Sequence, residues 1–378
     1  MKLFALAGMP IYFDHNATTP LDPRVLEAMQ PYLTSAWGNA SSLHRYGRIA
    51  RDAVEAARAQ VAALVGAQSS QLIWTSGGTE ADNLALQGLT DGVKPTRALY
   101  GVTEHPAVLE TCEALRGRGW QVETIAMDAQ GLVDGAAFDE QLARAPFRIA
   151  ALMAANNETG VIQDLASAAE RVHRHGGLLL VDAVQAAGKI PLDFAACGAD
   201  LLSLSSHKIY GPKGIGALVR KADIDLKPLQ HGGGQEHGLR GGTENVAAIV
   251  GFGAAAELAM HEREERAARL QGLRDRLESG LRLMAGVVIF GGQAPRLPNT
   301  LQFGLPRWEG EALLMALDRK GIAVSSGSAC SSGKGEPSHV LLGMGWPREV
   351  AYRAVRVSLG KDNTEAEIDR FLEVLTQL

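Results

Sequence analysis

Hydrophobic and polar positions follow two alternating patterns between about residues 45 and 250. Long stretches with helical spacing, such as GRIARDAVEAARAQVAALVGA (47–67), are each followed by a short apolar run. The short runs have the length of buried strands: QLIWTS (71–76), ALYGVT (98–103), RIAALMAANN (148–157), GLLLVDA (177–183) and ADLLSLSS (199–206). Helices that alternate with apolar strands indicate βαβ units around a mostly parallel sheet, buried on both faces.

The pattern changes after residue 254, where a long charged stretch begins. Its leucines form one helical stripe, at Leu270, Leu273, Leu277 and Leu281. Further on, 299–306 and 354–360 predict strands, while 310–321 and 364–378 predict helices. We therefore expect an α/β protein with a large domain over 14–258 and a smaller domain formed by 1–13 and 259–378.

Composition narrows the class of protein. The chain has 378 residues, is 46% hydrophobic and carries a net charge of -5, with no basic stripe that would indicate nucleic-acid binding. Its three cysteines, Cys112, Cys197 and Cys330, have neither paired nor zinc-like spacing, which favours a reducing compartment and no metal site. The N-terminal apolar run is too short for a signal peptide, and no segment has transmembrane length. We expect a soluble, cytoplasmic protein.

Polar residues follow five of the predicted strands. In parallel α/β sheets the ligand crevice lies beyond the carboxyl ends of the strands. The residues at these ends are the TSGGTEADN turn (75–83), Glu104 and His105, Asn156 to Glu158, Asp182 and Gln185, and Ser205 to Lys208. Each alone reads as an ordinary loop residue, but their convergence on one edge predicts a site.

The TSGGTEADN turn places Gly78 and hydroxyl groups where a strand gives way to a helix. Backbone N–H groups and the helix dipole there favour an anion such as a phosphate, with Ser76, Thr79 and Ser205 as hydroxyl donors. A glycine-rich turn is a weak signal by itself. GSACSSGKG (327–335) resembles a Walker loop only superficially, because its spacing is one residue too long and no Ser or Thr follows the lysine.

Asp182 and Lys208 each follow a buried strand. A carboxylate at Asp182 needs a cation or hydrogen-bond donors, and a protonated ring nitrogen would serve, although a helix cap is the plain alternative. A desolvated Lys208 beside His207 could form a Schiff base, although it also reads as a surface lysine past the strand end. Together with a phosphate seat and a histidine that can lie against a ring, these groups match pyridoxal 5'-phosphate.

At this point the chain resembles a known family. SSHKIYGPKG, HGGGQEHGLRGGTEN and SSGSAC are similar to motifs of the NifS/IscS-like cysteine desulfurases, within the class V aminotransferase family of fold-type I pyridoxal-phosphate enzymes. The resemblance runs from YFDHNATTP to VRVSLG, nearly the whole chain. It implies a mostly parallel seven-stranded sheet in the large domain, a homodimer, and conversion of L-cysteine to L-alanine.

The resemblance also implies residue roles. Lys208 would be the Schiff-base lysine, Asp182 would pair with the ring nitrogen, and His105 would stack on the ring and move protons. The remaining implied roles are a hydrogen bond to the phenolic oxygen from Gln185, phosphate contacts from Gly78, Thr79, Ser205 and His207, a phosphate contact across the dimer from Thr243, and substrate contacts from Arg356, Asn157 and Asn39.

Cys330 matches the nucleophile of the SSGSAC motif, which implies that it receives the substrate sulfur as a persulfide. Its Ser, Gly and Ala neighbours offer little packing, as a moving tether requires. The implied acceptor is an iron–sulfur scaffold or a carrier for transfer-RNA thiolation, and the residues do not distinguish the two. By contrast, Cys112 and Cys197 read as core residues.

Three other functions stay open. A selenocysteine lyase would use nearly the same site. Another class V aminotransferase would not need the loop cysteine, and a sulfur-carrier scaffold without catalysis would not need Lys208, Asp182, His105 and Arg356 together.

Overall fold

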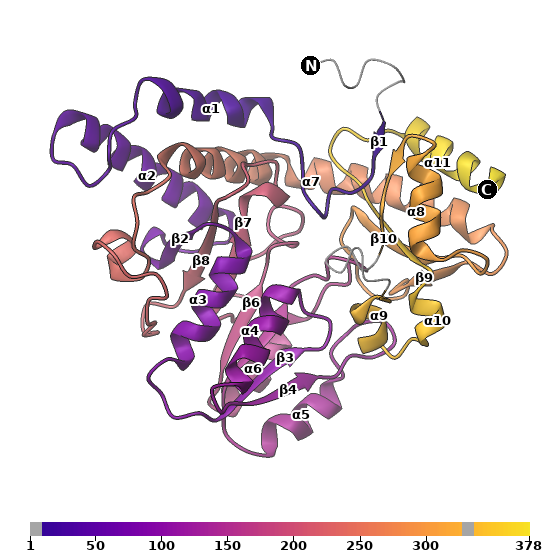
Figure 1. Ribbon diagram of the computed structural model, residues 1–378, viewed down its shortest axis with the longest axis horizontal. Coiled ribbons are helices and arrows are strands. Elements are labelled where there is room, and N and C mark those ends of the chain that lie inside the picture. Colours follow the sequence, from indigo (N-terminus) through magenta and orange to yellow (C-terminus); the bar gives the residue numbers. More distant parts are fainter. Residues whose placement is uncertain (1–9, 327–335) are drawn as a thin grey trace.

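The computed structural model describes residues 10–326 and 336–378. Its largest sheet has seven strands, and four neighbouring pairs are parallel (Figure 1). In spatial order the strands are β2 (Leu72–Thr75), β8 (Gly216–Arg220), β7 (Leu201–Ser205), β6 (Leu178–Asp182), β5 (Phe147–Met153), β3 (Arg97–Gly101) and β4 (Gln121–Ile125). β8 runs antiparallel to both of its neighbours, β2 and β7, and so against the direction of the other six strands. The predicted α/β fold with a mostly parallel seven-stranded sheet is confirmed.

Helices cover both faces of this sheet, because successive strand residues point to opposite sides. On β5, Ile149 and Ala151 pack in one hydrophobic core, while Ala150 and Leu152 pack in another. The first core is covered by α3 (Gly78–Thr90) and α4 (Pro106–Arg116). The second is covered by α2 (Arg45–Leu64), α5 (Gly135–Ala143), α6 (Leu165–Arg174) and the first part of α7 (Val246–Arg282).

Helix α7 joins this layered body to a smaller one, at the right of Figure 1. Its beginning packs on the large sheet, and its predicted leucine stripe is buried in a third core. Two small sheets surround that core. The first has four strands, in the order β12 (Ser325–Ser326), β13 (Ala354–Ser358), β10 (Thr300–Gly304) and β9 (Val288–Phe290), and the second pairs β1 (Ile11–Tyr12) with β11 (Ile322–Ala323). The helix runs unbroken through 258/259, so the domain division at that point stays a prediction.

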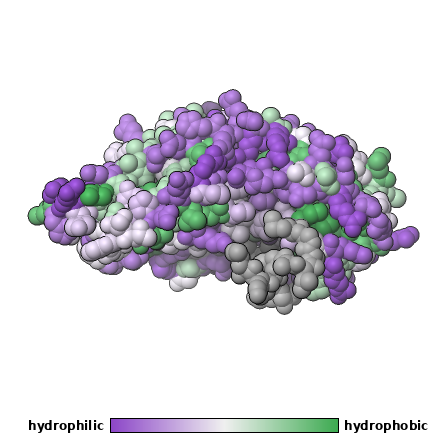
Figure 2. Space-filling model, turned by 90° about the horizontal axis from the view of Figure 1, so that it is seen from above, coloured by the Kyte–Doolittle hydropathy of each residue, from purple (hydrophilic) through white to green (hydrophobic). Residues whose placement is uncertain are grey.

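The remaining helices lie at the periphery: α1 (Pro23–Thr34), α8 (Gly310–Asp318), α9 (His339–Gly343), α10 (Arg348–Ala351) and α11 (Glu365–Gln377). Short 3-10 turns occur at Ser69–Gln71, Ser206–Lys208 and Gln235–Gly238. The face seen in Figure 2 is largely hydrophilic, with hydrophobic side chains near its left end. In the part of the chain that the structure describes, no helix is long and apolar enough to cross a membrane.

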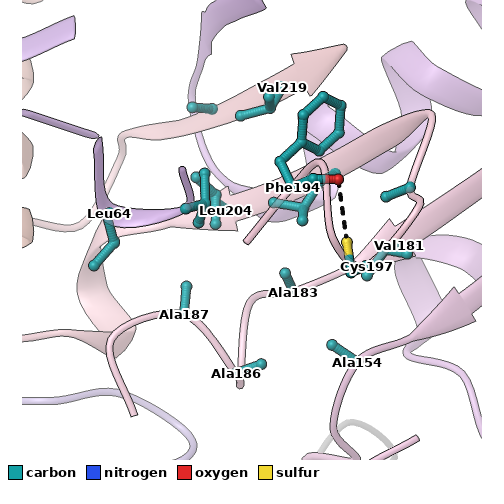
Figure 3. Close-up of a cluster of buried hydrophobic side chains, with 14 of the residues drawn as sticks. Leu64, Ala154, Val181, Ala183, Ala186, Ala187, Phe194, Cys197, Leu204 and Val219 are labelled. Atoms are coloured by element: carbon teal, nitrogen blue, oxygen red, sulfur yellow. Dashed lines mark hydrogen bonds between the residues drawn. The ribbon is translucent and has the colours of Figure 1, made fainter. Parts of the chain in front are cut away.

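Two of the cysteines are buried, as predicted. Cys112 lies in α4 with its side chain in the core between α3, α4 and the sheet. Cys197 lies on the opposite side, and its Sγ is 3.5 Å from the carbonyl oxygen of Phe194, among Val181, Ala183 and Leu204 (Figure 3). Burial raises the pKa of Cys112 to about 12, so its thiol stays protonated.

Candidate functional site

A cavity of about 670 Å³ lies at the carboxyl ends of the central strands. This volume is in the range of small-molecule and cofactor sites. Ten of the predicted site residues line it: Gly78, Thr79, His105, Asn157, Asp182, Gln185, Ser205, His207, Lys208 and Arg356. They come from strand ends that are far apart in sequence, as the expected convergence required.

Lys208 ends the 3-10 turn that follows β7. Its Nζ donates to the carbonyl oxygens of Asn16 (2.5 Å) and Ala17 (2.8 Å), which belong to the N-terminal segment that crosses the cavity. Two backbone carbonyl groups thus help to hold the amine at the cavity wall, where its charge also acts on Asp182. Such surroundings suit an amine that forms a Schiff base.

Asp182 is the last residue of β6 and is 6% exposed. Its Oδ1 accepts a hydrogen bond from the N–H of Val184 at 2.9 Å. Burial raises the pKa of Asp182, while His105 and Lys208 oppose that rise. A further cation in the cavity would stabilise the ionised carboxylate, as a protonated ring nitrogen would do.

Two buried carboxyl groups, Asp82 and Glu104, flank Asp182. The sequence analysis placed both at strand ends, within the TSGGTEADN turn and beside His105, but gave neither carboxyl a role. Each has one oxygen without a hydrogen-bond partner among the described residues. Burial, and then the charge of Asp182, raise the pKa of both carboxyls well above the ordinary value. We infer that both are neutral, so that Asp182 carries the negative charge. Asp82 was detectable, because it lies on the same face of its helix as the buried Ala85 and Leu86.

His105 is the N-cap of α4 and precedes Pro106. Its Nδ1 accepts from the N–H of Ala107 at 3.1 Å, which fixes the ring at the start of the helix. Burial lowers the pKa of His105; Asp182 opposes the change, and Lys208 adds to it. The imidazole is therefore neutral near neutral pH, as a proton-transfer group requires.

The turn at Gly77 and Gly78 begins α3 and faces Ser205 and His207 across the cavity. A Cβ on Gly78 would lie 2.6 Å from Cγ2 of Val184, so only glycine lets the turn approach the segment after Asp182. The first N–H groups of a helix at such a turn bind anions. Burial and the charge of Lys208 lower the pKa of His207 to about 4.

Ser76, the third predicted hydroxyl donor, is not among the residues that line the cavity. Its N–H donates to Oε2 of Glu80 at 2.7 Å, and Arg240 donates to the other oxygen of Glu80. We conclude that Ser76 supports the turn and that Thr79 and Ser205 are the hydroxyls facing the cavity.

Arg356 lies in β13 and is 2% exposed. Its Nη2 donates to Asp14 Oδ1 at 2.6 Å and its Nη1 to the carbonyl oxygen of Asn157 at 3.0 Å. The buried Nε has no partner in the described part of the chain. A guanidinium held in this way, with one donor unused, suits a carboxylate ligand.

Besides Ser76, three predicted residues are not placed in the cavity. Asn39 is exposed and its Oδ1 accepts from the N–H of Ser41, and Thr243 is also exposed. Cys330 lies outside the described residues. Within 10–326 and 336–378, no group of three or more His, Cys, Asp or Glu side chains could hold a metal ion.

The donor set fits pyridoxal phosphate. The cavity combines an amine, a buried carboxyl group, a neutral imidazole and a helix N-terminus with two hydroxyls. These groups match an aldehyde, a ring nitrogen, a ring face and a phosphate, respectively. The cofactor would be held by Lys208, Asp182 and His105, and its phosphate by Thr79 and Ser205.

Comparison with known proteins supports the same assignment. The model of the family "Aminotransferase class-V" matches residues 11–371. A "Cysteine desulfurase" from Gluconacetobacter diazotrophicus is 45% identical over 369 residues, which cover 97% of this chain and 92% of that protein. A solved "NIFS-LIKE PROTEIN" is 38% identical with a TM-score of 0.90, covering 98% of this chain and 100% of the other. "SspA in complex with cysteine" is 32% identical with a TM-score of 0.83, covering 94% and 100%.

Proposed function

The chain belongs to the class-V aminotransferase family and is a pyridoxal-phosphate-dependent cysteine desulfurase, and we propose that its cavity residues divide the reaction between them. The observation that carries this division is the meeting of Lys208, Asp182 and His105 in one cavity with Arg356. The overall reaction converts L-cysteine and the Cys330 thiol into L-alanine and a Cys330 persulfide. The carbon–sulfur bond breaks, a sulfur–sulfur bond forms, and the thiol proton is balanced by the proton gained on carbon.

Bound pyridoxal phosphate supplies an electron-withdrawing ring that weakens bonds at the substrate carbon. Lys208 anchors this group through its amine, and Asp182 keeps a proton on the ring nitrogen. His105, neutral at the cavity, accepts and returns protons during the reaction. Gly78, Thr79, Ser205 and His207 hold the phosphate, and Gln185 hydrogen-bonds the phenolic oxygen of the ring.

The substrate class follows from Arg356. Its fixed guanidinium, with Nε unused, offers the carboxylate of an amino acid a charged hydrogen bond in a buried setting. Asn157 lies at the cavity, and its carbonyl oxygen orients the same guanidinium. A solved relative was obtained with cysteine, which supports L-cysteine as the substrate here.

A homodimer would complete the site. Thr243 is exposed in one chain, where a partner subunit could use it for a phosphate contact. Large apolar side chains are also exposed from the end of α1 to the start of α2, namely Leu33 at 61%, Trp37 at 70%, Leu43 at 84% and Tyr46 at 54%. The connection between α1 and α2 lies at the left of Figure 1. An apolar group of this size suits a subunit interface. Asn39 lies in the same connection, and its substrate contact stays a prediction.

The fate of the sulfur is the least constrained part of the proposal. We propose a cytoplasmic enzyme that passes sulfur from Cys330 to an acceptor protein, either an iron–sulfur scaffold or a carrier for transfer-RNA thiolation. No described residue favours a selenocysteine lyase or another aminotransferase over this function. A scaffold without catalysis is disfavoured, because the cavity retains Lys208, Asp182 and His105 together with Arg356.

The test compares the purified protein with Cys330→Ala and with the control Cys197→Ala. All three should show the visible absorption band of bound cofactor. After addition of L-cysteine, the parent and Cys197→Ala should release alanine and reducible sulfur in equal amounts. Cys330→Ala should not release sulfur. Equal sulfur release by Cys330→Ala would refute the persulfide role, and absence of a visible band with added cofactor would refute the cofactor assignment.

A further inference from the structure

Lys189 lies behind the cavity, next to Gln185, and has no assigned role. Its Nζ donates to Oε1 of Gln185 at 2.7 Å and to Oδ1 of Asn16 at 3.0 Å. The charged groups that act on Lys189 are Lys208 and Arg356, and both are cations. A partly buried lysine that donates to two neutral amide oxygens is unusual, because burial of an ammonium group without a carboxylate partner is costly.

These bonds determine the orientation of the Gln185 amide. Its Nε2 donates to the carbonyl oxygen of Asn16 at 2.9 Å, while its Oε1 accepts from Lys189. A flipped amide would place its NH2 group against the amine and its oxygen against a carbonyl, losing both bonds. One N–H of Nε2 then remains for an acceptor in the cavity, which Gln185 also lines.

The same lysine holds Asn16, which joins several parts of the site. The carbonyl oxygen of Asn16 accepts from Lys208, and its Nδ2 donates to the carbonyl oxygen of Asn157. The side chain of Asn299 also donates to Asn16 Oδ1, at 3.1 Å. Lys189 is therefore bonded to the two residues that set the positions of the Gln185 donor and the Lys208 amine.

We propose that Lys189 is a positioning residue, which fixes the Gln185 amide so that its N–H faces the ring oxygen of the bound cofactor. This inference rests on the proposed function, since it needs pyridoxal phosphate in the cavity. The donor role holds for the ammonium and for the neutral amine, because both have N–H groups. Lys189 does not touch the reacting atoms and acts only through Gln185 and Asn16.

The groups around Lys189 determine the sign of the expected effect. Burial, and then Lys208 and Arg356, lower its pKa well below the ordinary value. The other titratable and charged groups near it are His15, His207, Arg263 and Arg266, the two arginines coming from α7. The nearest groups are thus cationic or neutral, so removing Lys189 removes a donor and, when it is charged, a positive neighbour of Lys208.

The test is the pH midpoint of the visible absorbance change of the bound cofactor. In Lys189→Met the Gln185 N–H is no longer held toward the ring oxygen, which becomes more basic. The proton whose loss changes the absorbance is then bound more tightly. The pH midpoint should rise by about one unit, which is a tenfold change in the dissociation constant of this proton. The matched control is Lys320→Met, an exposed lysine on the small domain side, with no change expected. Loss of stability alone would lower the melting temperature of the holoenzyme without moving this midpoint.

Two further variants test the route of the effect. Lys189→Gln keeps a donor and should shift the midpoint less than Lys189→Met; it also serves if Lys189→Met does not fold. In a Gln185→Met background the Lys189→Met shift should fall to less than half, because the lysine acts through that amide.

The outcomes separate the two proposals. A midpoint in both Lys189 variants equal to that of the Lys320→Met control would overturn the positioning role while leaving the proposed function intact. An undiminished shift in the Gln185→Met background would overturn the route through Gln185. A parent protein with no visible band would overturn the proposed function and the role of Lys189 with it.

Discussion

Replacing Glu236 by Gln should destabilise the protein by about 3 kcal/mol, at the low end of the range for breaking a buried ion pair. The Glu236 carboxylate lies in the segment that leads to Thr243 and is 7% exposed. Both its oxygens accept from Arg58, at 2.8 and 2.9 Å, and Oε2 also accepts from the N–H of Trp74 at 2.9 Å. This carboxylate fastens the segment to α2 and to the outer edge of β2.

The size of this destabilisation follows from the buried charge of Arg58, which remains in the variant. Arg58 is 6% exposed, and its other buried acceptor is the carbonyl oxygen of Leu72. Burial acts to lower the pKa of Arg58, but Glu236 and Glu55 raise it above the ordinary value, so the guanidinium stays charged. Glutamine keeps an oxygen for Trp74, but its NH2 group faces a guanidinium N–H of Arg58. The buried cation is then left with only the exposed carboxylate of Glu55 as an ionic partner.

The assay is equilibrium urea unfolding of the holoenzyme, followed by circular dichroism, for the parent, Glu236→Gln, Arg58→Met and the double variant. The double variant has no unpaired charge, so it should be destabilised by less than Glu236→Gln alone, by about 1–2 kcal/mol. A change under about 0.5 kcal/mol in Glu236→Gln, or additive losses in the double variant, would refute the reasoning. Glu257→Gln, which changes an exposed carboxylate on α7, is the control.

Three further predictions concern other parts of the molecule. Arg356→Lys replaces the fork by one nitrogen, so the KM for L-cysteine should rise about tenfold or more in steady-state assays while the visible band is unchanged. Burial, and then Lys189, lower the pKa of His15 to about 4. The contribution of the neutral imidazole to the free energy of unfolding is therefore complete above the pKa of His15 in the unfolded chain. It falls as the pH falls, by about 2 kcal/mol between about pH 7.5 and about pH 5, and His15→Phe should lose less over this range in urea unfolding. A Cβ at Gly216 would lie 2.6 Å from the backbone of Gly77, in the turn that would hold the phosphate. Gly216→Ala should therefore weaken cofactor binding about tenfold in absorbance titrations of the cofactor-free protein. Unchanged binding would contradict this.

Local pattern was sufficient for much of the fold. Apolar runs of strand length predicted β2, β3, β5, β6 and β7, and the leucine stripe predicted the buried face of the later part of α7. Side-chain periodicity reflects burial directly, and burial on both faces is what a parallel sheet requires. The antiparallel direction of β8 was not predicted, because strand direction depends on the path of the connection.

Some residues of the candidate site could be predicted from the sequence, and others could not. Lys208, Asp182 and His105 were selected because each follows a buried strand, and this position is visible in the sequence. Lys189 and Asn16 were missed, since lysine and asparagine in a turn carry no signal of their bonds. Their importance appears only when the N-terminal segment lies across the cavity.

The sequence by itself determined which segments become strands and helices and which chemical groups stand at the strand ends, because those properties depend on neighbours along the chain. Only the tertiary structure decided which of these groups contact one another or lie close enough to change one another's pKa. Arg356 meets Asp14 across 342 residues of sequence, and Asp82 and Glu104 acquire raised pKa values only beside Asp182 in a dry interior. Charge, hydrogen bonding and desolvation act through space, so protonation states and side-chain orientations are set by contacts that follow folding.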